Sequence, residues 1–141
     1  MEQATPRYYL VNHGRYYAKE ILFGCVFVPK TDAEEAERMR EIRVGDVIFH
    51  GSGSGISAVG VAVRRSRVVP YPAWRYAEGA PGARGEWLDT RDRLLAVPFP
   101  FRFSLGEYLT SVSNEKAEEW LSALARSNGF PTASDARRPR K

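Results

Sequence analysis

A glycine-rich link between two short apolar stretches constrains the fold more than any other feature of this sequence. The segment GSGSG occupies positions 51–55, and the stretches at 47–50 and 56–63 on either side of it have the composition of strands. Glycine adopts positive φ without steric penalty, so this link lets the two strands fold back tightly. The pattern therefore predicts a β-hairpin. It does not fit a phosphate-binding P-loop, because no Lys-Ser or Lys-Thr follows and the chain continues as a strand.

The first forty-odd residues carry further strand and helix signals. Residues 7–12 are rich in aromatic and β-branched types and favour a strand. A short helix is predicted at 17–23, with Gly24 ending it. A second helix is predicted to begin at a capping box and to end before the turn at 44–46. The box consists of Thr31 with Glu34 or Asp32 with Glu35, and the inner face of the helix consists of Ala33, Ala36 and Met39.

The second half of the chain is predicted to hold a long loop, two more strands and two more helices. The stretch 70–85 contains three prolines and is expected to be a long loop of functional importance. Strands are predicted at 87–89 and 94–99, and a short helix at the capping box of Ser104 and Glu107. An amphipathic helix begins at Ser113 or Asn114 and ends at 128–129. Its inner face consists of Ala117, Trp120, Leu121 and Leu124.

These elements define the fold class. At least five short strands with helices inserted between them predict an α+β fold with a curled sheet or small barrel, because the alternation is too irregular for a doubly wound parallel sheet. A chain of 141 residues, 43% of them hydrophobic, suits one domain with its own core, here placed at 1–131. The basic segment 132–141 is expected to be a disordered tail or the start of a linker.

Composition narrows the classes of function. Cys25 is the only cysteine, so it cannot form an internal disulfide, and it lacks the spaced partners of a zinc site. No apolar run approaches the roughly 20 residues that span a bilayer, and the first residues do not resemble a signal peptide. We therefore expect a soluble cytoplasmic protein with no membrane partner, no metal and no cofactor.

The net charge gives only weak support for a nucleic-acid partner. The formal charge is +4, and the segment 135–141 contributes three of these charges. The body is therefore nearly neutral. Local clustering is more informative, because Arg64, Arg65 and Arg67 follow an apolar strand pattern. If that strand continued, Arg65 and Arg67 would share a face that Arg64 does not.

Few residues suggest catalysis. His13 and His50 are the only histidines, and no serine or cysteine stands in a recognised nucleophile motif. We expect His50, at the end of its strand, to make a structural hydrogen bond. A non-enzymatic protein is therefore favoured, with a small hydrolase or nuclease built on the two histidines as the rival interpretation.

The aromatic residues point more clearly to a binding site. Trp120 lies on the apolar stripe of a helix and is expected in the core, and Trp87 is expected to pack at the start of a strand. Trp74 lies in the proline-rich loop, where it either stacks on a ligand or fixes the loop to the body. Phe27, which precedes Val28-Pro29, is either a core residue or the wall of a binding site.

Two stretches, "YYLVNHGRYYAKEILFGCVFVPK" and "MREIRVGDVIFHGSGSGISAVGVAV", resemble the EVE-like branch of the PUA superfamily, which is related to the YTH domains. The resemblance is strongest to versions found with HNH or AAA+ nucleases in modification-dependent restriction systems. It covers residues 8–63 well and is only suggestive at 86–109. Its elements are Val11-Asn12, Tyr17 with Glu20, Phe27-Val28-Pro29, Met39-Arg40-Glu41 and Gly45-Asp46.

The resemblance implies a curled sheet flanked by helices and a pocket for one nucleobase, often a methylated or hydroxymethylated one. Asn12 would hydrogen-bond the base edge, and Phe27 and Trp74 would wall the pocket, with Phe27 replacing the tryptophan usual in relatives. The implied base-binding set is Asn12, His13, Tyr17, Phe27, Val28 and Trp74, and the implied phosphate-binding set is Arg64, Arg65, Arg67 and Arg75.

The function implied is that of a DNA-binding reader that flips a C5-modified cytosine out of a duplex, with a nuclease domain or subunit as its effector. Asparagine suits such a role independently, because its amide both donates and accepts hydrogen bonds. The alternatives are a reader of N6-methyladenine or of an RNA mark, a small hydrolase or nuclease, and a protein-interaction module that uses the proline-rich loop.

Overall fold

The computed structural model describes residues 5–51, 55–78, 83–100 and 108–129. The strands are β1 (Tyr8–Asn12), β2 (Cys25–Pro29), β3 (Val47–Gly51), β4 (Ile56–Ala62), β5 (Arg67–Pro70), β6 (Arg84–Phe99) and β7 (Leu109–Val112). The helices are α1 (Tyr17–Phe23), α2 (Ala33–Glu41) and α3 (Asn114–Asn128), with 3₁₀-helices η1 (Gly14–Tyr16) and η2 (Ala73–Glu78). The predicted α+β class and single curled sheet are confirmed.

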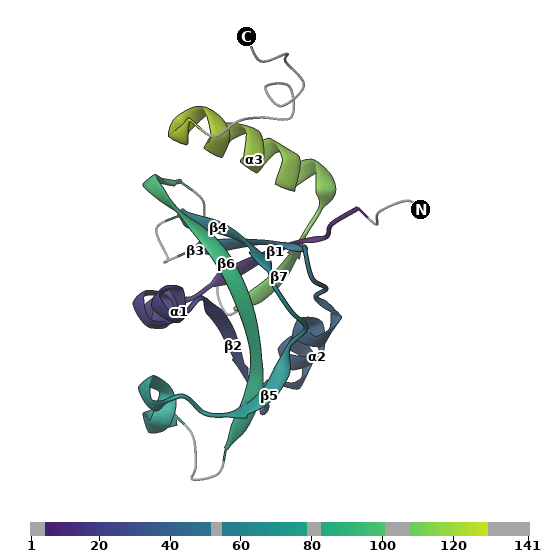
Figure 1. The fold of residues 1–141 in the computed structure, drawn as a ribbon, viewed down its shortest axis with the longest axis vertical. Coiled ribbons are helices and arrows are strands. Elements are labelled where there is room, and N and C mark those ends of the chain that lie inside the picture. The colour runs from purple at the N-terminus through teal and green to yellow at the C-terminus, as the bar shows by residue number, and fades with distance from the viewer. Residues whose placement is uncertain (1–4, 52–54, 79–82, 101–107, 130–141) are drawn as a thin grey trace.

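One mixed sheet organises these elements, in the order β2-β6-β4-β3-β1-β7, with β5 also paired to β6. Strands β1 and β3 are parallel, and the other pairs are antiparallel. The long strand β6 runs nearly the height of the molecule and joins the two halves of the sheet (Figure 1). Its first half pairs with β2 and β5, and its second half pairs with β4. The sheet therefore curls around β6.

Local sequence signals predicted several elements correctly. The hairpin of β3 and β4 is confirmed, with Val47 opposite Val61. Helix α1 has the predicted bounds, and Gly24 ends it at φ 63°, where its amide donates to Glu20 and Ile21. Helix α3 begins after Ser113, whose side chain accepts from the amide of Lys116.

Other predictions need correction. The two strands predicted at 87–89 and 94–99 are parts of the single strand β6. The loop predicted at 70–85 contains the 3₁₀-helix η2 and is preceded by β5, which was not predicted. Strand β7 was also missed, because it has only four residues. The helix predicted at Ser104 and Glu107 lies outside the described residues.

Helix α2 begins after Asp32 without the predicted capping box, because no side chain accepts a bond at that cap. Glu35 is instead buried and accepts the backbone amides of Tyr108 and Leu109, at 2.8 and 3.4 Å. Arg38 donates to the carbonyl of Leu109. Helix α2 therefore satisfies backbone groups at the start of β7, and this bond set holds the edge of the curled sheet in place.

Two apolar clusters stabilise the fold from opposite faces of the sheet. One includes Val26, Val28 and Leu88 and packs against Met39 of α2. The other lies under α3, which covers the upper end of the sheet (Figure 1), and its members are Leu10, Phe49, Ile56, Ala117, Trp120 and Leu124. Trp120 is thus a core residue, as predicted. No helix in the described part of the chain has both the length and the hydropathy needed to cross a bilayer.

Candidate functional site

Four buried polar side chains form a continuous chain where β1, β3 and β6 lie close to α1. His13 follows β1, Glu20 comes from α1, His50 lies in β3 and Asp92 lies in β6. The side chains of the two histidines and of Glu20 are 0% exposed, and that of Asp92 is 6% exposed. We call Glu20, His13, His50 and Asp92 the buried polar chain.

Each member of the buried polar chain is hydrogen-bonded to the next. Nδ1 of His13 contacts Oε2 of Glu20, and its Nε2 lies 2.6 Å from Nδ1 of His50. Nε2 of His50 lies 2.6 Å from Oδ1 of Asp92. Position 60 must be glycine for this approach, because a Cβ there would stand 2.0 Å from that carboxylate oxygen. The chain is therefore built into the packing of the strands.

Glu20 also connects the buried polar chain to Arg75 of η2 and to Tyr108. Its Oε1 accepts from Nη2 of Arg75 at 3.0 Å, and its Oε2 accepts from the Tyr108 hydroxyl at 2.5 Å. Arg75 is 4% exposed, and its guanidinium lies 4.0 Å from the ring centroid of Tyr16. Burial lowers the pKa of Arg75, but the fields of Tyr108 and Glu20 outweigh it and raise the pKa above its ordinary value. Arg75 therefore remains a buried cation paired with Glu20.

His13 and Asp92 of the buried polar chain differ in charge. Burial lowers the pKa of His13 below its ordinary value of 6.5, and the neighbouring His50 lowers it further. For Asp92, burial raises the pKa, but the hydrogen bonds from His50 and Thr90 outweigh burial and bring it below 3.8. At neutral pH the His13 ring is therefore neutral and the Asp92 carboxylate is ionised.

The pKa of Asp92 predicts a specific loss of stability in acid. Because its folded-state pKa lies below the ordinary 3.8, its stabilising contribution is present above pH 3.8 and is lost as the pH falls through the folded-state value. We expect the difference in free energy of unfolding between wild type and Asp92→Asn to shrink below pH 3.8. Urea unfolding from neutral pH into acid, followed by tryptophan fluorescence, measures this difference. A difference that stayed constant in acid would contradict the assignment.

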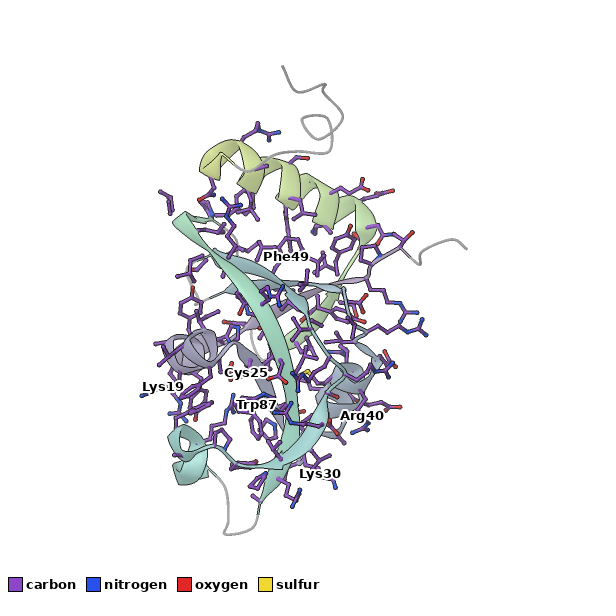
Figure 2. The ribbon with its side chains drawn as sticks, in the orientation of Figure 1. Lys19, Cys25, Lys30, Arg40, Phe49 and Trp87 are labelled. Atoms are coloured by element: carbon purple, nitrogen blue, oxygen red, sulfur yellow. The ribbon has the colours of Figure 1, made fainter. Side chains whose placement is uncertain are left out.

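A layer of aromatic rings covers the face of β2 and β6 toward α1 and η2, and Figure 2 labels Trp87 within it. Phe27 packs edge-on against Tyr71 and Trp87, with ring centroids 5.4 and 6.5 Å apart. Trp74 stacks on Phe23 at 5.0 Å and 12°, and its ring lies 6.0 Å from that of Trp87. Phe23 is 56% exposed, so this aromatic layer reaches the surface at α1.

One polar atom of Asn12, at the end of β1, and one of Trp74, in the aromatic layer, are shielded from solvent without a hydrogen-bond partner among the described residues. They are Oδ1 of Asn12 and Nε1 of Trp74. Asn12 is fixed by its backbone, since its amide donates to the carbonyl of Tyr108 at 2.8 Å and it pairs with Gly51 of β3. An unsatisfied buried group costs about 1–3 kcal/mol, so each atom is a place where a ligand group is favoured.

The predicted base-binding residues at the end of β1 lie together. His13 belongs to the buried polar chain, and the Tyr17 ring meets it edge-on at 5.8 Å between centroids. Burial raises the pKa of Tyr17 above 10.0, while a hydrogen bond with Ser57 of β4 opposes that rise. Asn12 lies directly before His13 in the chain. These three residues and the start of β4 therefore form one neighbourhood.

Phe27 and Val28 lie on opposite faces of β2, because successive strand residues alternate. Phe27 is 0% exposed in the aromatic layer and rests on the backbone of Gly85, where a Cβ would stand 2.4 Å from the ring. Trp74 lies in the same layer. Val28 packs in the cluster beneath α2 instead. Its side chain is therefore on the wrong face to share a pocket with Phe27 and Trp74, which corrects its place in the base-binding set.

The predicted phosphate-binding arginines do not act as one group. The prediction that Arg75 binds phosphate needs correction, because its side chain is buried against Glu20 and its charge faces the interior. Arg64 and Arg67 both reach Asp89, at 3.2 and 2.5 Å. The expectation that they lie on different faces of one strand is wrong, because β4 ends at Ala62 and β5 begins at Arg67.

The buried polar chain, Arg75 and Tyr108 together form one hydrogen-bond network. No function was predicted from the sequence for three of its residues. Glu20 belonged to the quoted family pattern, but nothing indicated that it would pair with Arg75, 55 residues away. Asp92 follows Arg91 and precedes Arg93 in a segment that reads as polar. Tyr108 comes after a stretch without periodicity. Only their placement on neighbouring elements reveals the network.

The described residues offer little for nucleophilic or metal chemistry. Burial raises the pKa of the Cys25 thiol far above its ordinary value, so it stays protonated and unreactive. In the described ranges no group of three or more His, Cys, Asp or Glu side chains is arranged to hold a metal ion.

Comparison with known proteins defines the fold alone. No family model and no curated protein matches the sequence. A protein from Pseudomonas syringae is similar in structure, with a TM-score of 0.55, 13% identity and coverage of 83% of this chain and 99% of that one. A hypothetical protein from Leishmania major has a TM-score of 0.58 at 12% identity, and the match covers 86% of this chain and 96% of that one. The NMR structure of a protein from Rhodopseudomonas palustris has a TM-score of 0.52 at 16% identity, and the match covers 94% of this chain and 99% of that one.

Proposed function

We propose that this protein is a non-catalytic reader of a modified base in DNA, of the EVE-like type within the PUA superfamily. The base is a C5-modified cytosine that is flipped out of the duplex, and the effector is a nuclease domain or subunit. The observation that carries the proposal is Oδ1 of Asn12, which is shielded from solvent and has no hydrogen-bond partner among the described residues.

The chemistry of Asn12 matches that of cytosine. The exocyclic amine of cytosine is a donor, so it can satisfy the unpaired Oδ1, and the amide nitrogen of Asn12 can donate to a ring acceptor. A base that completes these bonds recovers the roughly 1–3 kcal/mol lost to an unsatisfied group. A base with the wrong donor pattern leaves the oxygen unpaired, which gives the site its discrimination.

The aromatic layer supports the same proposal. Stacking on an aromatic side chain is worth about 1–3 kcal/mol per base, which is comparable to the few kcal/mol that flipping costs. Trp74 and Trp87 are half-buried, and Trp74 has an unpaired indole nitrogen. A methyl group at C5 adds about 0.8 kcal/mol when it is buried against such rings. The rings therefore favour a marked base over an unmarked one by a modest factor.

The buried polar chain supports a structural role for the two histidines. Both imidazoles are 0% exposed, and they hydrogen-bond to Glu20, to Asp92 and to each other. A general base must come within hydrogen-bond distance of the proton that it removes, and neither ring is open to a substrate. The geometry thus favours a binding protein over the rival hydrolase or nuclease.

A panel of oligonucleotides tests the proposal. Fluorescence anisotropy at fixed salt compares matched duplexes that carry cytosine, 5-methylcytosine, 5-hydroxymethylcytosine or N6-methyladenine, together with single-stranded DNA and RNA. The proposal predicts a preference of about fourfold, equivalent to the roughly 0.8 kcal/mol of a buried methyl group, for a duplex with a C5-modified cytosine over the unmarked duplex. A preference for N6-methyladenine or for RNA would show that this probe, and not a C5-modified cytosine in DNA, is the ligand. Equal binding of all probes would refute base reading.

A further inference from the structure

An arginine-rich groove lies beside α2, away from the aromatic layer. Figure 2 labels Arg40 on the opposite side of β6 from Lys19 of α1. The groove has a volume of about 450 Å³ and is lined by Arg7, Glu37, Arg40, Glu41, Arg43 and Arg65. A second hollow of about 620 Å³ shares Arg7 and Arg43 with it and extends to Asp46. We call the two hollows together the arginine groove.

Asp46 brings two of these arginines together through their backbones. Its Oδ1 accepts the amide of Arg7 at 3.0 Å, and its Oδ2 accepts the amide of Arg43 at 2.9 Å. Asp46 is 5% exposed. The carboxylate is thus occupied by backbone donors, and the two side chains stay exposed. No described carboxylate forms an ion pair with the guanidinium of either arginine.

Glu86 arranges the other side of the groove in a similar way. It is 3% exposed, and its Oε1 lies 3.1 Å from Nη1 of Arg40. Its Oε2 accepts from the Ser66 hydroxyl at 3.0 Å, which fixes the turn that carries Arg65. Nη2 of Arg65 donates to the carbonyl of Arg40 at 2.6 Å. Two buried carboxylates therefore position arginines from four chain segments around one groove.

We propose that the arginine groove binds the phosphodiester backbone of duplex DNA. This inference rests on the proposed function and adds a second contact surface to it. Guanidinium groups match phosphate oxygens in pairs, and contacts to phosphates position a protein on DNA without reading sequence. Several arginines in two adjoining hollows suit a run of phosphates better than a single anion. Glu37 and Glu41 on α2 form a wall that the phosphates avoid.

The test is the double variant Arg43→Gln/Arg65→Gln, with Lys19→Gln/Arg126→Gln as a control that removes the same two charges from α1 and α3. All four residues are exposed, so folding should not change. Affinities for unmarked and 5-methylcytosine duplexes are measured by anisotropy over a series of salt concentrations. For the groove variant we expect both affinities to fall by the same factor, at least about tenfold at low salt. The slope of log affinity against log salt should fall by about 1.8, since each duplex phosphate contact contributes about 0.9.

The outcomes separate this inference from the proposed function. If the groove variant has the same salt slope and the same affinities as the control variant, phosphate binding by the arginine groove is refuted. A wild-type preference for the marked duplex would still support base reading in that case. If the groove variant loses affinity equally for both duplexes but keeps the wild-type preference, the inference is supported. A wild-type protein that bound no duplex would overturn both.

Discussion

Replacing Glu20 by alanine lowers the free energy of unfolding by about 3–5 kcal/mol, the range for breaking a buried ion pair by removing one partner. Glu20 accepts from Arg75 and Tyr108 and contacts His13, and its side chain is 0% exposed. The substitution leaves the guanidinium of Arg75 buried without its carboxylate. It also leaves the Tyr108 hydroxyl without its acceptor. Urea unfolding followed by fluorescence and circular dichroism measures the loss.

Further variants make the Glu20 result interpretable. Glu34→Ala removes an exposed carboxylate from α2, and its free energy of unfolding should stay near that of wild type. If Glu20→Ala does not fold, Glu20→Gln keeps the side-chain volume and should still lose a large part of the stability. Arg75→Met should cost much less in a Glu20→Gln background than in wild type, because the two residues are coupled. A Glu20→Ala protein as stable as wild type would refute the network.

Replacing Asn12 by alanine should separate binding from stability. Oδ1 of Asn12 has no partner among the described residues, so removing it should leave the free energy of unfolding unchanged or slightly higher. The affinity for the preferred marked duplex should nevertheless fall about ten- to hundredfold, which corresponds to about 1–3 kcal/mol. The affinity for the unmarked duplex should fall by a similar factor, because unmodified cytosine presents the same exocyclic amine to Oδ1. Anisotropy and urea unfolding of the same preparations give both quantities.

Asn128→Ala is the matched control for Asn12→Ala. Asn128 of α3 accepts the amide of Ala96 at 2.9 Å and donates to the carbonyl of Leu124 at 3.1 Å. Its removal should lower stability and leave the affinity for DNA intact, the opposite pattern to Asn12→Ala. If Asn12→Ala bound every oligonucleotide as well as wild type, base reading by this residue would be wrong.

The parts of the fold that sequence predicted are those fixed by local signals. The glycine-rich link specified the hairpin of β3 and β4, and glycines with positive φ ended α1 and α3. The single strand β6 was predicted as two because Asp92 and its arginine neighbours interrupt its apolar pattern. Asp92 contributes to that polar stretch, although its side chain is buried. It pairs with His50 of β3, on the far side of β4. Periodicity cannot reveal a polar residue whose partner is distant in sequence.

The candidate site was likewise predicted only in part from the sequence. Asn12 and Tyr17 were implied by the family resemblance, and Trp74 was also singled out by its place in the proline-rich loop. The family resemblance implied that Arg75 binds phosphate at the surface. Its burial depends on Glu20, which lies on another element. The arginine groove was not predicted either, because Asp46 and Glu86 assemble it from segments that are far apart in the chain.

Anisotropy of the wild type and Asn12→Ala on one pair of duplexes tests the central claim most directly. The duplexes are identical except that one carries a single 5-methylcytosine in place of cytosine. We expect a preference of about fourfold for the marked duplex in the wild type, and a fall of about ten- to hundredfold in the affinity of Asn12→Ala for both duplexes. Equal affinity of the wild type for both duplexes, or wild-type affinity in Asn12→Ala, would contradict base reading at Asn12.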